Sequence, residues 1–302
     1  MSIDRPERAG AANHVDRGWA RAERLDASRV VGHLEEQTGV QLIVEGPCAG
    51  GEVGAAFVRW PDGHRSVLKW RPGTQLSAME AGPLAVTEAA RTAGLPAPAT
   101  ELAVQVGTAV ATVQQLLPGA PIRRLDSRGL AQAVAFNALQ TGLLADRPDI
   151  PELDLYLLAD GPGFCLHGPL RAHDRRTARL DAWVTAVGAA HPGLLRGVDA
   201  VHLDYHPGNL LAVDGTITGI IDWDGAGRGD RRLDLVTLRF GVHAEQPDDE
   251  VAKQLDAVLD TFPADVLRPL WAHMSLRQVD WSIRHHTPAD VTHWLNLAEQ
   301  RL

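Results

Sequence analysis

The sequence predicts an α+β fold made of two lobes. Short β-type runs are concentrated before residue 117, whereas helical periodicity dominates after it. The length of 302 residues is about twice that of an average domain, and the apolar share of 45% and charged share of 22% are typical of a globular protein. We therefore divide the chain into an N-terminal arm, a β-rich N-lobe and a mainly helical C-lobe, over residues 1–25, 26–117 and 118–302.

Charge and composition limit the partners and the compartment. The net charge of -9 would repel a phosphate backbone, which argues against nucleic acid as a partner. Two cysteines are too few for a disulfide scaffold, and the sequence has neither an apolar run long enough to span a membrane nor an N-terminal secretory signal. We expect a cytoplasmic protein that binds no membrane, either a monomer or a homodimer.

The N-lobe is expected to begin with a helix and an antiparallel meander. Asp26 or Ser28 can cap a helix that ends at Gly39 and carries an apolar stripe of Val30, Val31 and Leu34. Three short runs rich in β-formers follow, with a Gly-rich link and then a Pro-Asp-Gly turn between them; they cover residues 40–45, 56–60 and 66–70.

A second helix and two more strands complete the predicted N-lobe. Residues 78–93 have a helical composition, although Gly82-Pro83 is expected to break or begin this helix. Residues 100–117 are rich in Val and Thr and are split by Gly107, as two paired strands would be. Together with the meander, these strands predict a five-stranded sheet plus a helix.

The C-lobe is predicted to be helical except for one hairpin. Residues 210–222 form a β island whose Asp214-Gly215 pair is a strong signal for a two-residue turn. The predicted helices cover residues 127–144, 174–190, 231–243, 248–261, 263–286 and 289–302.

The most informative segment lies just before and after this hairpin. His202, Asp204 and Asn209 have the spacing H-x-D-x-x-x-x-N of a phosphotransferase catalytic loop, and the hairpin returns a second carboxylate, Asp222. Phosphoryl transfer needs hard oxygen ligands for Mg²⁺ and a separate carboxylate that accepts the proton of the nucleophile. Each residue alone is a common turn or cap former. Their joint spacing favours phosphoryl transfer.

The segments HLDYHPGNLL and GIIDWDGAGRGDRRLDL resemble the aminoglycoside phosphotransferase and choline kinase family, a branch of the protein-kinase-like fold. The resemblance is strongest over residues 201–235 and weaker over 46–117. It implies that Asp204 is the catalytic aspartate and that His202 orients the loop around it. It also implies that Asn209 and Asp222 bind Mg²⁺, and that Asp234 supports the catalytic loop through backbone hydrogen bonds.

The resemblance further implies a nucleotide site for ATP or GTP in the N-lobe. Lys69, on the third predicted strand, matches the lysine that pairs with the α and β phosphates. Glu80 and Glu88 are both candidates for the carboxylate that holds this lysine. We prefer Glu88, because it lies beyond the expected helix break.

Two backbone segments complete the predicted nucleotide site. Gly50 and Gly51 lie between the first two strands, where the chain must approach phosphates, although they do not form a G-x-G-x-x-G pattern. Gln115 and Leu117 belong to the segment that matches the adenine-binding hinge of the family.

The predicted activity is transfer of the γ-phosphoryl group of ATP to a hydroxyl of a small, cationic molecule. An aminoglycoside-like antibiotic, inactivated to give resistance, is the first choice. Polycations need carboxylates for charge-assisted bonds, and the candidates are Asp224, Glu245 and Asp280. Trp281 is a further candidate through cation-π contact, although core packing explains most of the C-terminal tryptophans and histidines.

Other functions stay open at this point. The same fold includes kinases of choline, fructosamine and homoserine. From a different class, His202, Asp204 and His206 also form an H-x-D-x-H run that suits a metal-dependent hydrolase. A third reading is a nucleotide-binding module that no longer catalyses. The presence of Asp204 beside the predicted nucleotide and metal ligands argues against this reading.

Overall fold

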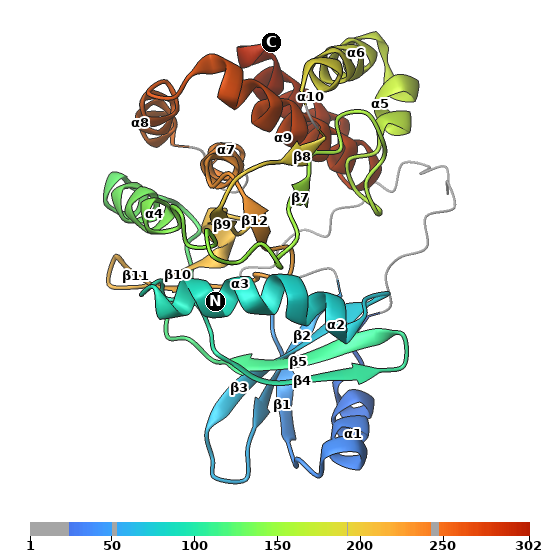
Figure 1. Cartoon of the computed structure of the whole chain (residues 1–302), viewed down its shortest axis with the longest axis vertical. Helices are drawn as coiled ribbons and strands as arrows, with labels where there is room; N and C mark the ends of the chain where they lie inside the picture. The colour runs from blue at the N-terminus through green and yellow to red at the C-terminus, as the bar shows by residue number, and fades with distance from the viewer. Residues whose placement is uncertain (1–23, 50–52, 192, 243–247) are drawn as a thin grey trace, which may run out of the picture.

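The strands and helices of the chain are segregated, as expected for the α+β class. The computed structural model describes residues 24–49, 53–191, 193–242 and 248–302. A five-stranded sheet lies in the lower half of Figure 1, and most helices lie in the upper half. The predicted arm is outside the described residues except for its last two positions.

The sheet is antiparallel and has the strand order β1-β2-β3-β5-β4. This confirms the predicted meander and the strand pair that turns at Gly107, whose φ is 61°. Because side chains alternate along β3, its buried residues Leu68 and Trp70 face one side and Lys69 faces the other. The strands are β1 (Ile43–Pro47), β2 (Ala55–Arg59), β3 (Arg65–Pro72), β4 (Thr100–Val106) and β5 (Ala109–Gln115).

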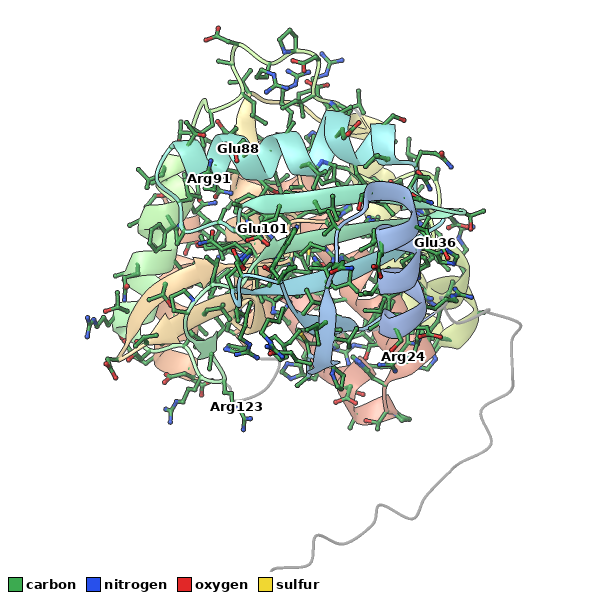
Figure 2. The ribbon with its side chains drawn as sticks, turned by 90° about the horizontal axis from the view of Figure 1, so that it is seen from below. Arg24, Glu36, Glu88, Arg91, Glu101 and Arg123 are labelled. Carbon is green, nitrogen blue, oxygen red and sulfur yellow. The ribbon has the colours of Figure 1, made fainter. Side chains whose placement is uncertain are left out.

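One helix, α1 (Ala27–Thr38), covers the outer face of this sheet (Figure 2). Asp26 caps it by accepting from the N–H of Arg29, and Gly39 ends it in the left-handed conformation. The predicted stripe of Val30, Val31 and Leu34 is buried against the sheet. The opposite face of the sheet carries Lys69, which pairs with residues of the C-terminal part.

The expected helix break at Gly82-Pro83 does not occur. Helix α2 (Leu76–Met79) continues through a π-helical turn, η1 (Glu80–Leu84), into α3 (Ala85–Thr92). Proline lacks an N–H and its ring crowds the preceding turn, and the wider π turn accommodates both without ending the helix. The buried side of this continuous helix carries Met79, Val86 and Ala90.

In its described residues, the C-terminal part contains the six predicted helices and one that was not predicted, the seven-residue α5. The central element is α9, whose buried residues include Trp271 and which packs against α5, α6, α7 and α10. The helices are α4 (Ser127–Leu139), α5 (His167–His173), α6 (Arg175–Ala190), α7 (Arg232–Gly241), α8 (Asp249–Leu259), α9 (Ala264–His285), α10 (Pro288–Ala298) and the 3-10 turn η3 (Glu299–Arg301). Among the described residues, no helix is long and apolar enough to cross a membrane.

Small β elements connect these helices to the sheet. The predicted hairpin at Asp214-Gly215 is present, with φ of 49° and 70° at its two turn residues. It joins β10 (Leu210–Val213) to β11 (Thr216–Ile220), and β10 also pairs with β6 (Ala120–Pro121). Two further pairs are β9 (Asp199–Val201) with β12 (Gly227–Gly229) and β7 (Leu153–Asp154) with β8 (Leu194–Leu195).

Candidate active site

A buried carboxylate, Asp234, supports the loop that follows β9 by accepting hydrogen bonds from its backbone. Asp234, on α7, accepts hydrogen bonds from the backbone N–H of His202 at 2.8 Å and of Leu203 at 2.9 Å. Nε2 of Gln140 donates a third bond at 3.0 Å. Burial raises the pKa of Asp234 to about 7. The predicted support of this loop by Asp234 is therefore confirmed.

His202 is fully buried and connects two segments of the site. Its Nε2 lies 2.8 Å from the carbonyl oxygen of Ile221, and its Nδ1 accepts the N–H of Asp204 at 3.2 Å. These two partners define a neutral imidazole that donates through Nε2, and burial lowers the pKa of His202 to about 4. Because both nitrogens are engaged, His202 is not free to bind a metal.

The hydrolase reading of H-x-D-x-H depended on a cluster of metal ligands. In the described part of the chain, no group of three or more His, Cys, Asp or Glu side chains is arranged to hold a metal ion. The buried, bonded state of His202 explains why the run does not form such a cluster.

Asp204 and Asn209 lie at opposite ends of the same loop and contact each other directly. Nδ2 of Asn209 donates to the carbonyl oxygen of Asp204 at 2.9 Å and to its Oδ2 at 3.0 Å. The carbonyl oxygen of Asn209 accepts the N–H of Ile221 at 2.9 Å. The loop is thereby closed on itself and fastened to the segment that carries Asp222.

The carboxylate of Asp204 also has two basic neighbours. Nη2 of Arg277, on α9, donates to its Oδ1 at 2.9 Å, and Nε2 of His206 lies 3.4 Å from its Oδ2. Burial alone would raise the pKa of Asp204, but Arg277 and then His206 hold this pKa well below its usual range. Asp204 is therefore ionised at neutral pH.

Lys69 reaches from the sheet to the segment after β11. Its Nζ lies 2.7 Å from Oδ1 of Asp222 and 2.7 Å from Oδ2 of Asp224. Burial lowers the pKa of Lys69, but the charges of Asp224 and Asp222 outweigh this effect and raise it above the usual value. The charge of Lys69 lowers the pKa of Asp222 in turn. Side chains that are 153 residues apart in the chain thus form one charged group.

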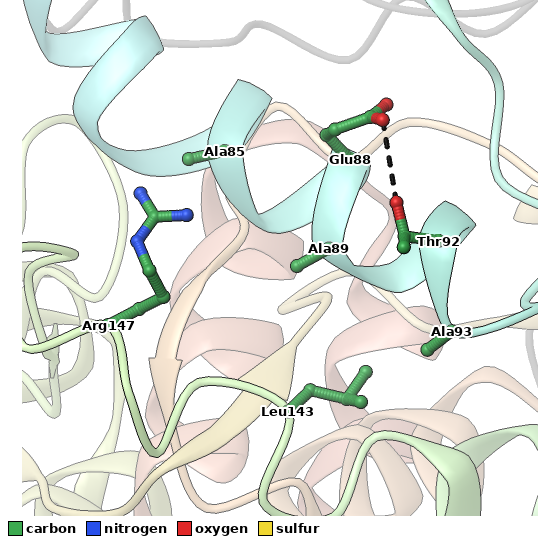
Figure 3. A pocket seen from close by; sticks show the side chains of 7 residues that line it. All are labelled: Ala85, Glu88, Ala89, Thr92, Ala93, Leu143 and Arg147. Carbon is green, nitrogen blue, oxygen red and sulfur yellow. Dashed lines mark hydrogen bonds between the residues drawn. The ribbon is translucent and has the colours of Figure 1, made fainter.

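The expected partner of Lys69 requires a correction. Glu88 bonds to Arg91, one turn further along α3, with Glu88 Oε1 2.6 Å from Arg91 Nη2. Figure 3 shows Glu88 and Thr92 beside a groove of about 460 Å³ that is lined by α3, Leu143 and Arg147. Glu80 is exposed as well. The buried residues of the helix are Met79, Gly82, Val86, Thr87 and Ala90 and include no carboxylate. Asp222 and Asp224 therefore take the place predicted for a glutamate.

The remaining residues predicted for the nucleotide site are two glycines and two residues of the predicted hinge. Gly50 and Gly51 are outside the described residues. Gln115 ends β5, with its N–H and its side-chain Oε1 both bonded to the backbone of Ala99. Leu117 follows, half-buried beside Gly219 of β11, where a Cβ on that glycine would lie 3.1 Å from Leu117 Cδ1.

Two of the carboxylates predicted for the acceptor are engaged elsewhere, and a third lies outside the described residues. Asp224 pairs with Lys69. Asp280 is fully buried, where it accepts from Arg284 at 2.7 Å and from the N–H of Leu166 at 3.0 Å, so it stabilises the core instead of binding an acceptor. The third candidate, Glu245, is not described.

The aromatic candidate, Trp281, is half-buried on α9. Its ring centroid lies 4.0 Å from that of His285, and the guanidinium of Arg284 lies 5.5 Å from the ring. Trp271 and Trp294 are buried in the helical core, which confirms core packing for these two. Trp281 shares a helix face with Arg277, four residues earlier.

Arg277 is the residue that sequence reasoning missed. Besides Asp204, it donates through Nη1 to the carbonyl oxygen of Leu203 at 2.6 Å. Leu203 has φ of 71°, a conformation that a branched side chain rarely adopts. The one signal in the sequence is weak: an arginine four residues before Trp281 on a predicted helix.

The arrangement contains oxygen atoms suited to Mg²⁺. Because the amide nitrogen of Asn209 makes both bonds to Asp204, its side-chain oxygen is the atom left for a cation. Asp222 uses Oδ1 for Lys69 and is 48% exposed. Magnesium usually takes only one or two protein ligands and completes its octahedron with phosphate oxygens and water. Asn209 and Asp222 fit this requirement.

Solved structures with the same fold include several small-molecule kinases. A thermostable mutant of aminoglycoside phosphotransferase APH(4)-Ia, in a ternary complex with AMP-PNP and hygromycin B, has a TM-score of 0.65 at 16% identity, over 90% of this chain and 97% of that one. Spectinomycin phosphotransferase APH(9)-Ia, with ADP and spectinomycin, has a TM-score of 0.58 at 11% identity, over 91% and 94%. These likenesses confirm the predicted protein-kinase-like fold.

Three further findings concern the relatives of this chain. A protein from Haemophilus somnus 129PT assigned as a fructosamine-3-kinase has a TM-score of 0.56 at 13% identity, over 90% of this chain and 96% of that one. The curated proteins contain no match. A model of the phosphotransferase enzyme family, by contrast, matches residues 15–270. This match includes the loop of Asp204 and Asn209, Lys69 and Asp222, and the chain therefore belongs to the phosphotransferase enzyme family.

Proposed function

We propose that the chain transfers the γ-phosphoryl group of ATP or GTP to a hydroxyl of a small molecule, with Mg²⁺ as cofactor. One observation carries this proposal: Lys69 pairs with Asp222, Asn209 bonds to Asp204, and the backbone of Ile221, the residue before Asp222, bonds to Asn209 and joins the two pairs. Phosphoryl transfer needs such an arrangement, because positioning and charge neutralisation supply most of the acceleration.

Each residue has a distinct proposed role. Lys69 binds the α and β phosphates after exchanging its aspartate partners for them. Asn209 and Asp222 would hold Mg²⁺, which when bound neutralises charge on the β and γ phosphates. Asp204, held by Asn209 and Arg277, orients the acceptor hydroxyl for in-line attack and accepts its proton. His202 fixes the loop that carries Asp204 relative to the segment that carries Asp222, through its bond to the carbonyl oxygen of Ile221.

The remaining nucleotide contacts follow from the matching positions. We assign the adenine to the backbone of the segment containing Gln115 and Leu117, and the phosphates to the loop of Gly50 and Gly51. We also propose that residues 26–117 form the nucleotide-binding lobe and 118–302 the catalytic lobe, in a cytoplasmic enzyme. The comparison structures that hold AMP-PNP or ADP support nucleotide use.

Two classes of acceptor are consistent with this chemistry. The first is a cationic, aminoglycoside-like antibiotic, as suggested by neighbours that bind hygromycin B and spectinomycin. The second is a metabolite, as suggested by the fructosamine-kinase neighbour.

The proposal is tested by incubating the chain with Mg²⁺, ATP and a panel of antibiotics and small alcohols, and by measuring a mass gain of one phosphoryl group. Asp204→Asn should bind Mg·ATP normally and lose about 100-fold to 10,000-fold in kcat, as expected for loss of a general base. Asp222→Ala should weaken Mg·ATP binding itself. Asp62→Asn, at a 71% exposed site, is the matched control. Full activity of Asp204→Asn would refute the proposed role.

A further inference from the structure

Arg277 places a fixed positive charge beside the group that must face the acceptor. Its two terminal nitrogens bond to Oδ1 of Asp204 and to the carbonyl oxygen of Leu203. Its side chain is 24% exposed, against 35% for Asp204, so both groups reach the surface of the site. An acceptor hydroxyl that approaches Asp204 therefore comes close to a guanidinium.

Carboxylates that could balance an incoming positive charge are already paired. Asp224 and Asp222 share Lys69, Asp280 is buried with Arg284, and Asp204 is itself paired with Arg277. Two exposed carboxylates, Asp154 and Asp160, lie in the same segment as the aromatic residues Tyr156 and Phe164. The charge of Asp154 contributes to raising the pKa of Tyr156, and Asp160 accepts the N–H of His167 at 2.8 Å. Two exposed carboxylates, one of them already bonded to the backbone, are too few to bind a molecule with several ammonium groups.

The surroundings of Arg277 are aromatic. Its guanidinium lies 5.8 Å from the ring of Phe164, which makes an edge-on contact with Tyr156 at 5.4 Å between centroids. Trp281 lies one turn further along the same face of α9. Phe164, Tyr156 and Trp281 are all half-buried. Such rings provide an apolar surface against which a flat or ring-shaped molecule packs.

We infer that the acceptor is a neutral or anionic alcohol with an apolar face, and that Arg277 is the residue that excludes polycations. This inference rests on the proposed function. The charge of Arg277 cancels that of Asp204, so an incoming ammonium group loses the attraction of this carboxylate. At about 6 Å and an effective dielectric constant of about 20, that attraction is worth about 100-fold in affinity. A carboxylate or phosphate at the same place gains from the remaining N–H groups of the guanidinium.

The test compares acceptors that keep the same hydroxyls and differ in charge. Hygromycin B, spectinomycin and kanamycin are each paired with the derivative whose amines are fully acetylated, which keeps the hydroxyls and loses the ammonium groups. Choline is paired with 3,3-dimethylbutan-1-ol, its uncharged isostere. Turnover is followed by mass gain, and affinity is followed by calorimetry on the protein saturated with Mg·AMP-PNP. We expect the uncharged member of each pair to be favoured at least 10-fold. A preference for the charged members would overturn the inference.

Variants of Arg277 identify the cause of the preference. Arg277→Gln should reduce the preference for uncharged acceptors by 10-fold to 100-fold. Arg277→Lys should keep this preference and lower kcat, because lysine retains the positive charge but cannot donate to Asp204 and to the carbonyl oxygen of Leu203 at the same time. Arg268→Gln removes an exposed arginine from the same helix and is the matched control. An unchanged preference in Arg277→Gln would refute the role of Arg277.

The same samples separate this inference from the proposed function. Asp204→Asn is measured with every acceptor. If it forms product as fast as the natural chain, the proposed function fails regardless of charge preference. If product formation depends on Asp204 and the polycations react faster, only the inference about the acceptor fails. Asp154→Asn should then weaken polycation binding, whereas under our inference it leaves the affinity for uncharged acceptors unchanged.

Discussion

Nε2 of His202 lies 2.8 Å from the carbonyl oxygen of Ile221, so one buried imidazole joins the loop of Asp204 to the residue before Asp222. We expect His202→Leu to lose about 2 to 4 kcal/mol of stability, since it leaves a buried carbonyl without its donor. It should also lower kcat, because the loop that carries Asp204 is no longer fixed relative to the segment that carries Asp222. Chemical denaturation and steady-state kinetics measure these effects. The matched control is His33→Leu at an exposed site, and equal stability of the two variants would contradict the prediction.

Gly241, at the end of α7, lies against the loop of Asp204. A Cβ at this position would lie 2.6 Å from Cβ of His206 and 3.0 Å from Cδ of Pro207. Gly241→Ala should therefore displace the loop and lower kcat at least 10-fold, since small displacements at a reacting centre are costly. Gly32→Ala, on α1, has no described atom within 4 Å of the added Cβ and should stabilise the protein by up to about 1 kcal/mol. Unchanged kcat in Gly241→Ala would disprove the steric argument.

Asp280 and Arg284 form an ion pair inside the helical core, with Asp280 fully buried. Removing Asp280 leaves the guanidinium of Arg284, which is 9% exposed, without its carboxylate partner. Asp280→Ala should therefore lose about 3 to 5 kcal/mol of stability. Thermal and urea unfolding test this, with Asp260→Ala, 63% exposed, as the control. If Asp280→Ala were as stable as the natural chain but had a raised KM for the acceptor, the original assignment of Asp280 to the acceptor site would be correct.

His273 is fully buried on α9, and neither ring nitrogen has a hydrogen-bond partner among the described residues. Burial, followed by the charge of Arg277, lowers the pKa of His273 to about 3. The unfolded chain binds a proton at this residue near pH 6.5, whereas the folded chain does not, so stability is lost as the pH falls from 6.5 towards 3. The loss is about 1.4 kcal/mol per pH unit over this window.

His273→Leu should remove this contribution. The difference in unfolding free energy between the natural chain and His273→Leu should therefore change by about 2 kcal/mol between pH 6.5 and 4.5, in favour of the variant at low pH. Urea titrations at four or five pH values measure it. Parallel stability curves for the two proteins would show that the imidazole is not buried in its neutral form.

Features with a local cause could be predicted from the sequence. The Asp214-Gly215 turn follows from the tolerance of both residues for positive φ, and the cap of α1 follows from the side chain of Asp26. The spacing of Asp204 and Asn209 also has a local meaning, because both residues belong to one closed loop. These predictions depend on a few neighbouring residues and not on the packing of the whole chain.

Contacts between distant segments could not be predicted. The pairing of Lys69 with Asp222 spans 153 residues and that of Arg277 with Asp204 spans 73. The sequence offered only Glu80 and Glu88 as partners of Lys69, and that choice depended on which side of a helix faces the sheet; the π turn at Pro83 alters that side. A single sequence carries little information about such choices, because many charged residues have equivalent local surroundings.

The two aspartates on Lys69 also affect how nucleotide affinity responds to salt. A phosphate that binds this lysine replaces one anion by another, so the number of close ion pairs changes little on binding. Screening by added electrolyte weakens the initial and final pairs alike. We therefore expect the dissociation constant for Mg·ATP to vary less with ionic strength in the natural chain than in Asp224→Asn, in which the lysine has one competitor fewer.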